Sequence, residues 1–300
     1  MTTDTDTTDE EHEEAQRLIT DGGTDTQAKL VGGASGESVE IDTSGRTFRP
    51  MLHPITCLVS EAKLQFDARG MFVSAVDPAN VGMVELHANA EAFDYFDASE
   101  ELTIGTNLTR LRSSVSSARI GKRSDDPISL TLDETATTVA IERDYDGTEL
   151  RQTAEHLNID PDSIRQEPDL PDLELPAEAT VSPSALKAAT DVVDEATDHA
   201  VVTAAGDTLA IAADTDEARG QYGTAVEFDV DVDIEEGVEA TSQFSLDYLS
   251  DMADALVKAK VDAVHIEWGD EMPTMLNFER TEEDTVLYEG TLMLAPRLSS

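Results

Sequence analysis

Cysteine, aromatic residues and basic residues are all scarce in this sequence, and the scarcity excludes several classes of protein. Cys57 is the one cysteine, so the chain can form neither an internal disulfide nor a cysteine-based zinc site. It stands in the apolar run 55–59, which predicts a buried structural thiol. No apolar stretch reaches the length of a transmembrane helix, and the acidic first residues lack the hydrophobic segment of a signal peptide. We therefore expect a soluble cytoplasmic protein that makes no contact with a membrane.

Signatures of catalysis and of metal binding are also missing. The chain has no Gly-x-Ser-x-Gly elbow and no phosphate-binding loop. Residues 229–233 begin like a calcium-binding loop, but Ile234 and Ala240 replace the required glycine and carboxylate. The alternation of valine and aspartate instead favours a strand with one solvent-exposed face. The six histidines show no metal-ligand spacing, and His87 and His265 lie in strand patterns that indicate structural roles. The sequence predicts a protein that is not an enzyme and holds no metal or cofactor; a carboxylate-based nuclease is disfavoured.

Acidic residues outnumber basic residues by 64 to 20, which gives a formal net charge of −44. The carboxylates are spread through otherwise foldable sequence, with valine, alanine and threonine between them, and this spacing indicates a solvated surface. Such a surface repels itself at low ionic strength and destabilises the compact state. At about 1 M salt the Debye length falls to roughly 3 Å, and most of this repulsion disappears. The composition therefore predicts a halophilic host and leaves the function open.

Composition and periodicity divide the chain into four segments. Residues 1–36 combine low hydrophobicity with high net charge, which predicts a disordered acidic tail. Residues 37–157 and 176–300 each show the order strand, helix, strands, helix, strands, so we predict two similar domains. Residues 158–175 contain a run of prolines and are expected to form an extended connector.

Four helices are expected in the two domains. Amphipathic patterns mark three of them, at residues 107–118, 182–196 and 245–258, and capping residues stand at the start of the first two. The first helix of the chain is compromised, because Pro50 fits a first turn but Pro54 would fall inside the helix. An interior proline costs about 3 kcal/mol, so this helix is predicted to be short or kinked.

Four stretches of the chain carry a resemblance to a known family. Residues 72–84 read Phe-Val-Ser-Ala-Val-Asp-Pro-Ala-Asn-Val-Gly-Met-Val, and residues 160–171 read Asp-Pro-Asp-Ser-Ile-Arg-Gln-Glu-Pro-Asp-Leu-Pro. Residues 244–249 and 294–298 read Phe-Ser-Leu-Asp-Tyr-Leu and Leu-Ala-Pro-Arg-Leu. In order and spacing these stretches resemble the signature, the interdomain connector, the last inner helix and the docking tail of archaeal, especially haloarchaeal, sliding clamps. These clamps are relatives of eukaryotic proliferating cell nuclear antigen, and the resemblance covers about residues 38–300.

The resemblance implies an α+β fold with two similar sliding-clamp domains per subunit, in which antiparallel sheets lie outside and helices line a ring. Three subunits would close the ring by pairing edge strands, near residues 148–156 of one subunit and 209–216 of the next. The implied function is a processivity factor for DNA replication and repair, which encircles duplex DNA without sequence preference. The implied partners are DNA polymerase, the clamp loader, flap nuclease and DNA ligase, each bound through a short docking peptide.

Two sets of site residues follow from the resemblance. Enclosure does not depend on tight phosphate contacts, which weaken steeply with salt through counterion release, so a few basic side chains on the inner helices suffice. The DNA-facing candidates are Arg46, Arg49, Arg110, Arg112, Arg119, Lys122, Arg123, Lys187, Lys258 and Lys260. This set departs from the family's usual positions, since several family lysine sites carry serine or alanine here. The candidates for the partner-peptide pocket are Val76, Leu170, Pro273, Met293, Ala295 and Pro296.

A second function stays open on the sequence alone. The chain could be a diverged clamp paralogue that acts as an acidic protein-interaction module without encircling DNA. Its acidic extension and its proline-disturbed first helix favour this alternative. The sequence also leaves open whether the subunits pair with themselves or with a paralogue.

Overall fold

The computed structural model of the chain describes residues 37–98, 100–116, 126–165, 170–171, 173–204, 208–213, 224–234, 238 and 240–297. The expected acidic tail, residues 1–36, lies outside the described residues, so its disorder remains a prediction. Among the helices of the described residues, none combines the length and the apolar character needed to cross a membrane.

The first half of the chain runs in the order strand, helix, five strands, helix, three strands. β1 (Ser38–Ser44) leads into a helical segment made of α2 (Gly45–Met51) and α3 (His53–Thr56). The next five strands are β2 (Glu61–Asp67), β3 (Gly70–Val76), β4 (Gly82–Asn89), β5 (Tyr95–Ala98) and β6 (Leu102–Asn107). α4 (Leu108–Ser116) precedes the last three strands, which are β7 (Pro127–Asp133), β8 (Ala136–Tyr145) and β9 (Thr148–Leu157).

The second half repeats this order of elements. β10 (Ala177–Val181) leads into α5 (Pro183–Asp194). Five strands follow, which are β11 (His199–Ala204), β12 (Leu209–Ala213), β13 (Ala225–Phe228), β14 (Val232–Ile234) and β15 (Thr241–Ser245). α6 (Leu246–Ala259) precedes β16 (Ala263–Trp268), β17 (Thr274–Glu282) and β18 (Thr285–Leu294). The predicted α+β fold with an internal duplication is therefore confirmed.

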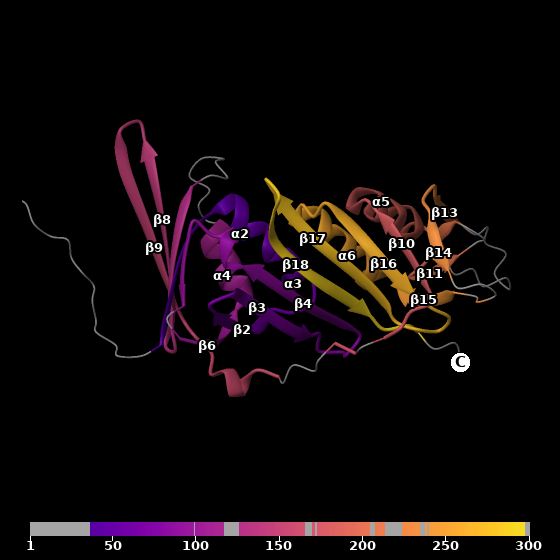
Figure 1. Ribbon diagram of the computed structural model, residues 1–300, viewed down its shortest axis with the longest axis horizontal. Coiled ribbons are helices and arrows are strands. Elements are labelled where there is room, and N and C mark those ends of the chain that lie inside the picture. The colour runs from indigo at the N-terminus through magenta and orange to yellow at the C-terminus, as the bar shows by residue number, and fades with distance from the viewer. Residues whose placement is uncertain are drawn as a thin grey trace, which may run out of the picture. The chain divides into compact units, whose positions relative to one another are not determined.

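Strand order repeats as well, and one strand pair joins the two halves (Figure 1). The three sheets have the orders β5-β1-β7-β8-β9, β14-β10-β16-β17-β18-β4-β3-β2-β6 and β13-β12-β11-β15. The nine-stranded sheet joins a five-strand set of the second half to a four-strand set of the first through antiparallel pairing of β18 with β4. Because the halves are equivalent, β9 corresponds to β18 and β13 corresponds to β4.

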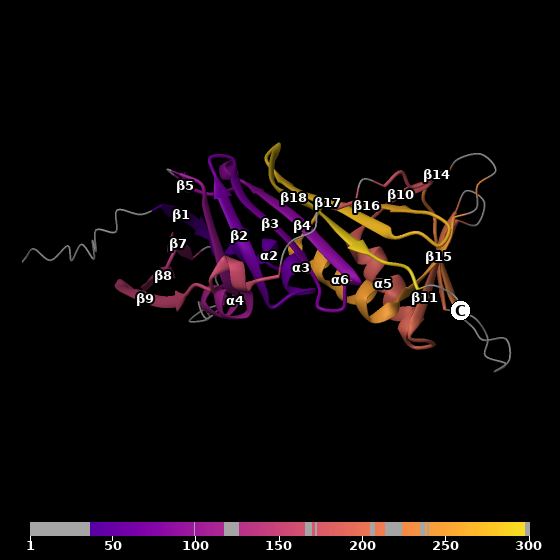
Figure 2. The same ribbon diagram turned by 90° about the horizontal axis from the view of Figure 1, so that it is seen from below.

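The helices pack against one another beside the nine-stranded sheet, as Figure 2 shows for α3, α6 and α5. Capping residues explain where α4 and α5 begin: the Asn107 side chain accepts the Arg110 N–H at 2.9 Å, and Ser182 Oγ accepts the Ala185 N–H at 3.2 Å. The predicted stripe on α5 is buried and consists of Leu186, Ala189 and Val193. The three predicted helices are therefore confirmed to within two residues at each described end, while the predicted end of the first at residue 118 lies outside the described residues.

The first helix is interrupted, as predicted, but the two prolines have exchanged roles. Pro50 lies inside α2 rather than in a first turn, and Pro54 lies in the first turn of α3, where its missing N–H costs little. The helix breaks at Leu52 between them. Cys57 follows α3 and is partly exposed rather than fully buried, yet burial of its Sγ still raises the pKa of the thiol to about 12.

The prediction that residues 209–216 form an edge strand for pairing between subunits is wrong. β12 pairs with β11 on one side and with β13 on the other, so its backbone groups are already satisfied. Among the described strands, β13 is the edge of this sheet, and β9 is the edge of the five-stranded sheet, as expected near residues 148–156. The sequence also did not reveal β5, β10 or β15, which are short and lack a run of large apolar residues.

Candidate functional site

Two helices, α4 and α6, bring basic side chains of the DNA-facing set close to α3. Arg112 on α4 is exposed, and its Nη1 donates to Thr56 Oγ1 on α3 at 3.2 Å. Burial, and then the charges of Arg112 and of Lys258 on α6, lower the pKa of His53 to about 4. The imidazole of His53 is therefore neutral at physiological pH, and the positive charge at this junction belongs to Arg112 and Lys258.

The two arginines of α2 have different surroundings. Arg46 is exposed, and its Nε lies 3.7 Å from Glu282 Oε1 on β17. Arg49 is partly buried, and its Nε donates to the Val115 carbonyl oxygen at 2.9 Å. Arg49 thus ties α2 to the last turn of α4, a structural role that the sequence did not reveal. Arg110, by contrast, is exposed on α4.

The helices of the second half carry more carboxylates than cations on their exposed sides. Lys187 on α5 pairs with Asp191, and Lys258 on α6 pairs with Asp254. Asp251 is exposed on α6, and burial, followed by the charges of Asp247 and Asp254, raises its pKa. The candidate DNA-facing lysines of this half are therefore largely neutralised by neighbours on their own helices.

Of the remaining basic candidates, one lies in an exposed turn and the other three lie outside the described residues. Lys260 is exposed, has a φ of 57° and ends α6 in a left-handed turn. Arg119, Lys122 and Arg123 fall within residues 117–125, which lie outside the described residues. Their DNA-facing role stays a prediction.

On the other face of the sheet, the candidate pocket residues share a cross-strand row. Val76 on β3 and Met293 on β18 both stand directly opposite Met83 on β4, and Met293 stands opposite Met275 on β17. Directly opposed residues point to the same side of a sheet, so this row forms one apolar surface. Met83 is only 2% exposed, so it is the floor of the row. The sequence missed Met83 and Met275 because only strand register places them there.

The connector and the C-terminal segment run past the same end of β3 and β4. The Leu170 N–H donates to Glu85 Oε1 at 3.2 Å, and Arg165 Nη1 donates to the Asp77 carbonyl oxygen at 3.3 Å. The Ala295 N–H donates to the Val81 carbonyl oxygen at 2.8 Å. Leu170, Ala295 and their neighbours Pro273 and Pro296 are each partly exposed, as a surface for a docking peptide requires.

A buried carboxylate holds the loop between β3 and β4 and ties it to the second half. Asp77 accepts the N–H groups of Ala79, Val81 and Gly82 at 2.9, 2.6 and 2.7 Å, and the hydroxyl of Tyr248 on α6 at 2.7 Å. Burial alone would raise the pKa of Asp77, but these donors outweigh burial and lower it. The Asp-Pro-Ala-Asn loop beside the pocket is therefore fixed by an ionised group.

Comparison with known proteins identifies the family. Residues 42–163 match the N-terminal domain of proliferating cell nuclear antigen. A DNA polymerase sliding clamp of Natronomonas pharaonis is 37% identical over 258 residues, which span 86% of this chain and 97% of the relative. The chain belongs to the sliding-clamp family of proliferating cell nuclear antigen. The expected resemblance to haloarchaeal clamps is also confirmed, since a DNA polymerase sliding clamp of Halobacterium salinarum is 37% identical over 261 residues, with the same coverage of both chains.

Solved structures of the clamp family share the fold. The structure described as the C-terminal region of FEN-1 bound to A. fulgidus PCNA has a TM-score of 0.73 and 26% identity, and the match covers 87% of this chain and 99% of that one. PCNA from Thermococcus kodakaraensis has a TM-score of 0.72 at 23% identity, with 86% and 100% of the two chains covered, and supports the fold alone.

Proposed function

We propose that this chain is the subunit of a ring-shaped, non-enzymatic clamp that encircles duplex DNA and tethers DNA polymerase, the clamp loader, flap nuclease and DNA ligase. Its clamp domains would span residues 37–157 and 176–300, joined by the connector 158–175. The observation that carries the proposal is the junction inside the chain, where β18 of the second half pairs with β4 of the first. The equivalent strands β9 and β13 are edges among the described strands, so the same pairing is available between subunits. A head-to-tail contact of this kind generates a ring when its rotation closes.

The side chains at the two edges are complementary. β9 exposes Leu150 and Leu157, which are 43% and 74% accessible, and Arg151, whose side chain is 67% accessible. β13 and α5 line a cavity of about 460 Å³ that includes Val192 and Glu227. In a head-to-tail contact, an apolar side chain and a cation from one edge would thus meet an apolar cavity and a carboxylate from the other.

The acidic exposed sides of α5 and α6 also favour the alternative, an acidic interaction module that does not surround DNA. Lys187 and Lys258 are paired with carboxylates, so these helices offer little free positive charge to phosphates. A clamp that encloses DNA tolerates this arrangement, because a closed ring stays on the duplex without binding its phosphates. At high salt, the repulsion between the helix carboxylates and the phosphates is also screened. We therefore infer the clamp.

Ring formation is tested by measuring mass in molar KCl with light scattering. The wild-type protein should have the mass of three subunits, and Val192→Asp on α5 should reduce it to one subunit because a charge enters the apolar cavity. Val257→Asp is the matched control, since Val257 is 36% exposed on α6 and lies outside that cavity. A wild-type monomer at micromolar concentration would instead support the acidic module.

The partner pocket is tested separately from the ring. Replacing Leu170 and Pro296 together with serine should abolish stimulation of the polymerase while the mass stays that of three subunits. Truncating apolar anchors at an interface typically removes most of its binding energy. Polymerase stimulation that is unchanged in the double variant would contradict the assignment of the pocket.

A further inference from the structure

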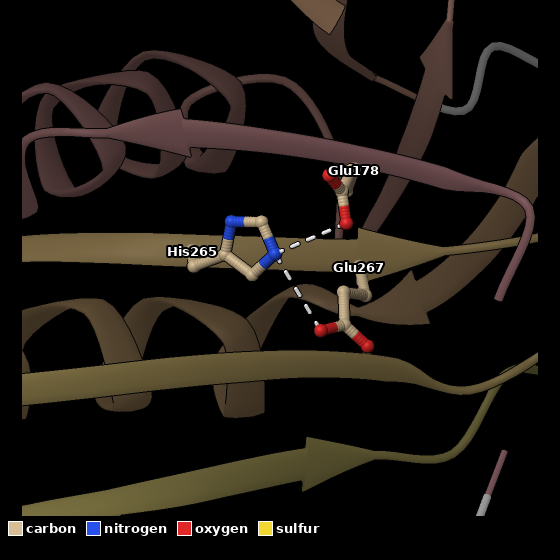
Figure 3. Close-up of side chains that lie close together, drawn as sticks. All are labelled: Glu178, His265 and Glu267. Carbon is tan, nitrogen blue, oxygen red and sulfur yellow. Dashed lines mark ion pairs between the residues drawn. The ribbon is translucent and has the colours of Figure 1, made fainter. Parts of the chain in front are cut away.

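Three potential metal ligands converge on the solvent-facing side of the nine-stranded sheet (Figure 3), where Glu267 stands directly opposite Met275 of the pocket row. Glu178 lies on β10, and His265 and Glu267 lie on the neighbouring strand β16. His265 Nε2 is 3.3 Å from Glu178 Oε2 and 3.5 Å from Glu267 Oε1. One ligand atom of each residue lies within 4.8 Å of the other two.

Strand register places the two carboxylates of this cluster directly opposite each other, so a cation between them would be stabilising. Glu178 stands directly opposite Glu267, and Thr180 stands directly opposite His265. Like charges that are directly opposed across two strands destabilise the pairing. The distances from His265 to the carboxylates also exceed the roughly 2.7–2.9 Å of a charge-assisted N–H···O bond.

The separations fit two edges of a tetrahedral coordination shell. Zinc binds imidazole nitrogen and carboxylate oxygen at about 2.0–2.2 Å, so adjacent tetrahedral ligands lie about 3.3–3.6 Å apart. We propose that Glu178, His265 and Glu267 bind one divalent transition-metal ion, best represented by Zn²⁺. The imidazole ligand disfavours Mg²⁺ and Ca²⁺, which take oxygen donors.

Neighbouring side chains hold two of the three ligands in place. Thr180 Oγ1 lies 3.2 Å from His265 Nδ1, and in the metal-binding tautomer it accepts the Nδ1–H, which leaves the Nε2 lone pair for the ion. Asn277 Nδ2 donates to Glu267 Oε1 at 2.9 Å. Thr291 Oγ1 in turn donates to Asn277 Oδ1 at 2.6 Å. Such supporting bonds are typical of built metal sites.

The ion would connect β10 to β16 and keep one open position. His265 also lines a cavity of about 450 Å³ with Thr180, Asn277 and Thr291, which gives room for a water ligand. β10 is the first strand after the connector, so the ion would strengthen the pairing of the strand that begins the second half. Sequence spacing did not reveal this site because Glu178 lies far from β16 along the chain.

Binding is tested by titrating the metal-free full-length protein with Zn²⁺ in a molar potassium salt of a weakly coordinating anion, with calorimetric detection. We expect one Zn²⁺ bound per chain at this site. His265→Gln and Glu178→Gln should each weaken binding at least about tenfold, since even supporting residues contribute about 10–100-fold. Glu178→Gln removes a like-charge contact, so without Zn²⁺ it should melt no lower than the wild type.

Two control variants separate this cluster from other ligands. His87 lies on the same sheet with one carboxylate nearby, its Nδ1 being 3.8 Å from Glu289 Oε1, and His87→Gln should leave Zn²⁺ affinity unchanged. His12 stands between glutamates in the N-terminal segment, and His12→Gln should likewise have no effect. Bound Co²⁺ should show the intense visible bands of tetrahedral coordination. Wild-type affinity in His265→Gln, an equal loss in His87→Gln, or a weak octahedral Co²⁺ spectrum would overturn the proposal.

Asn277→Ala provides a test that keeps all three ligands. It should weaken Zn²⁺ binding about 10–100-fold without abolishing it, because Glu267 loses the bond that orients it. An unchanged Zn²⁺ affinity in this variant would count against the built site even if His265→Gln failed to fold.

Discussion

At the scale of single residues, Asp77 shows how one ionised group fixes the loop between β3 and β4. Its carboxylate is buried and accepts four hydrogen bonds, three from the loop that it begins and one from Tyr248 of the other half. Each bond to a charged group contributes about 1.5–3 kcal/mol, whereas a buried carboxylate without partners would be destabilising. The side chain therefore couples the position of the loop beside the pocket to the packing of α6.

Replacing Tyr248 with phenylalanine should lower the free energy of unfolding by about 1.5–3 kcal/mol, because Asp77 stays buried with one donor fewer. Denaturant unfolding in molar KCl measures this change. Asp94→Asn is the control, since Asp94 is exposed and its replacement should stay within about 0.5 kcal/mol of the wild type. A loss in Tyr248→Phe no larger than in the control would contradict the coupling.

Asp77 also predicts a dependence of stability on pH. The folded-state pKa of Asp77 is lowered, so its contribution is fully present above the unfolded pKa of about 3.9 and is lost as pH falls through the folded value. Asp77→Asn cannot titrate, so the gap in unfolding free energy between wild type and variant should be constant at neutral pH and shrink below about pH 4. Denaturant unfolding at successive pH values checks this, and a gap that widens in acid would refute it.

At the scale of elements, α2 survives its interior proline because another side chain replaces the missing donor. Pro50 has no N–H to donate to the carbonyl of Arg46, four residues earlier. Arg280 on β17 donates Nη1 to that same Arg46 carbonyl oxygen at 3.3 Å. Arg280 is only 4% exposed and also pairs with Glu282. A strand of the second half thus completes a helix of the first.

A double-mutant cycle tests whether the Arg280 guanidinium replaces the missing backbone N–H of residue 50. Arg280→Met should destabilise the wild type by several kcal/mol, because Arg280 is buried and the Arg46 carbonyl loses its partner. In a Pro50→Ala background the loss should be smaller, since the new N–H of residue 50 can bond to Arg46. Coupling energies between contacting residues are typically about 0.5–3 kcal/mol. If the changes in unfolding free energy of Arg280→Met and Pro50→Ala simply add, Arg280 does not replace the missing donor of Pro50.

The sequence predicted those elements whose signals are local and missed those that depend on register. Helices α4, α5 and α6 could be predicted because an apolar stripe, and for α4 and α5 also a cap, lies within one segment. The roles of Pro50 and Pro54 were assigned wrongly because the helix begins earlier than the pattern indicates. The position of β13 at the edge of its sheet and the burial of Met83 could not be predicted, since pairing across strands decides which strand is an edge and which residue is buried.

At the scale of the whole molecule, the charge of −44 and the clamp fold impose opposite demands. The proposed ring would bring three such chains together, while net charge of one sign opposes both association and the compact state. Screening resolves the conflict, because the Debye length is about 10 Å at 0.1 M salt and about 3 Å at 1 M. Adjacent carboxylates such as Asp247, Asp251 and Asp254 on α6 are the places where this repulsion is concentrated.

Asp251→Asn should therefore stabilise the protein, and more so as the KCl concentration falls. The raised folded-state pKa of Asp251 means that its ionised form is less favourable in the folded protein, so the cost is present above that pKa and includes neutral pH. Thermal melting of wild type and variant between molar and 0.1 M KCl should show a difference that grows as screening is lost. The exposed Asp94→Asn, which removes the same unit of charge, should show a smaller gain at every concentration. Equal gains in the two variants would mean that net charge, rather than the carboxylate row on α6, sets the salt requirement. If screening is the cause, replacing KCl by NaCl at equal ionic strength should leave the melting differences unchanged.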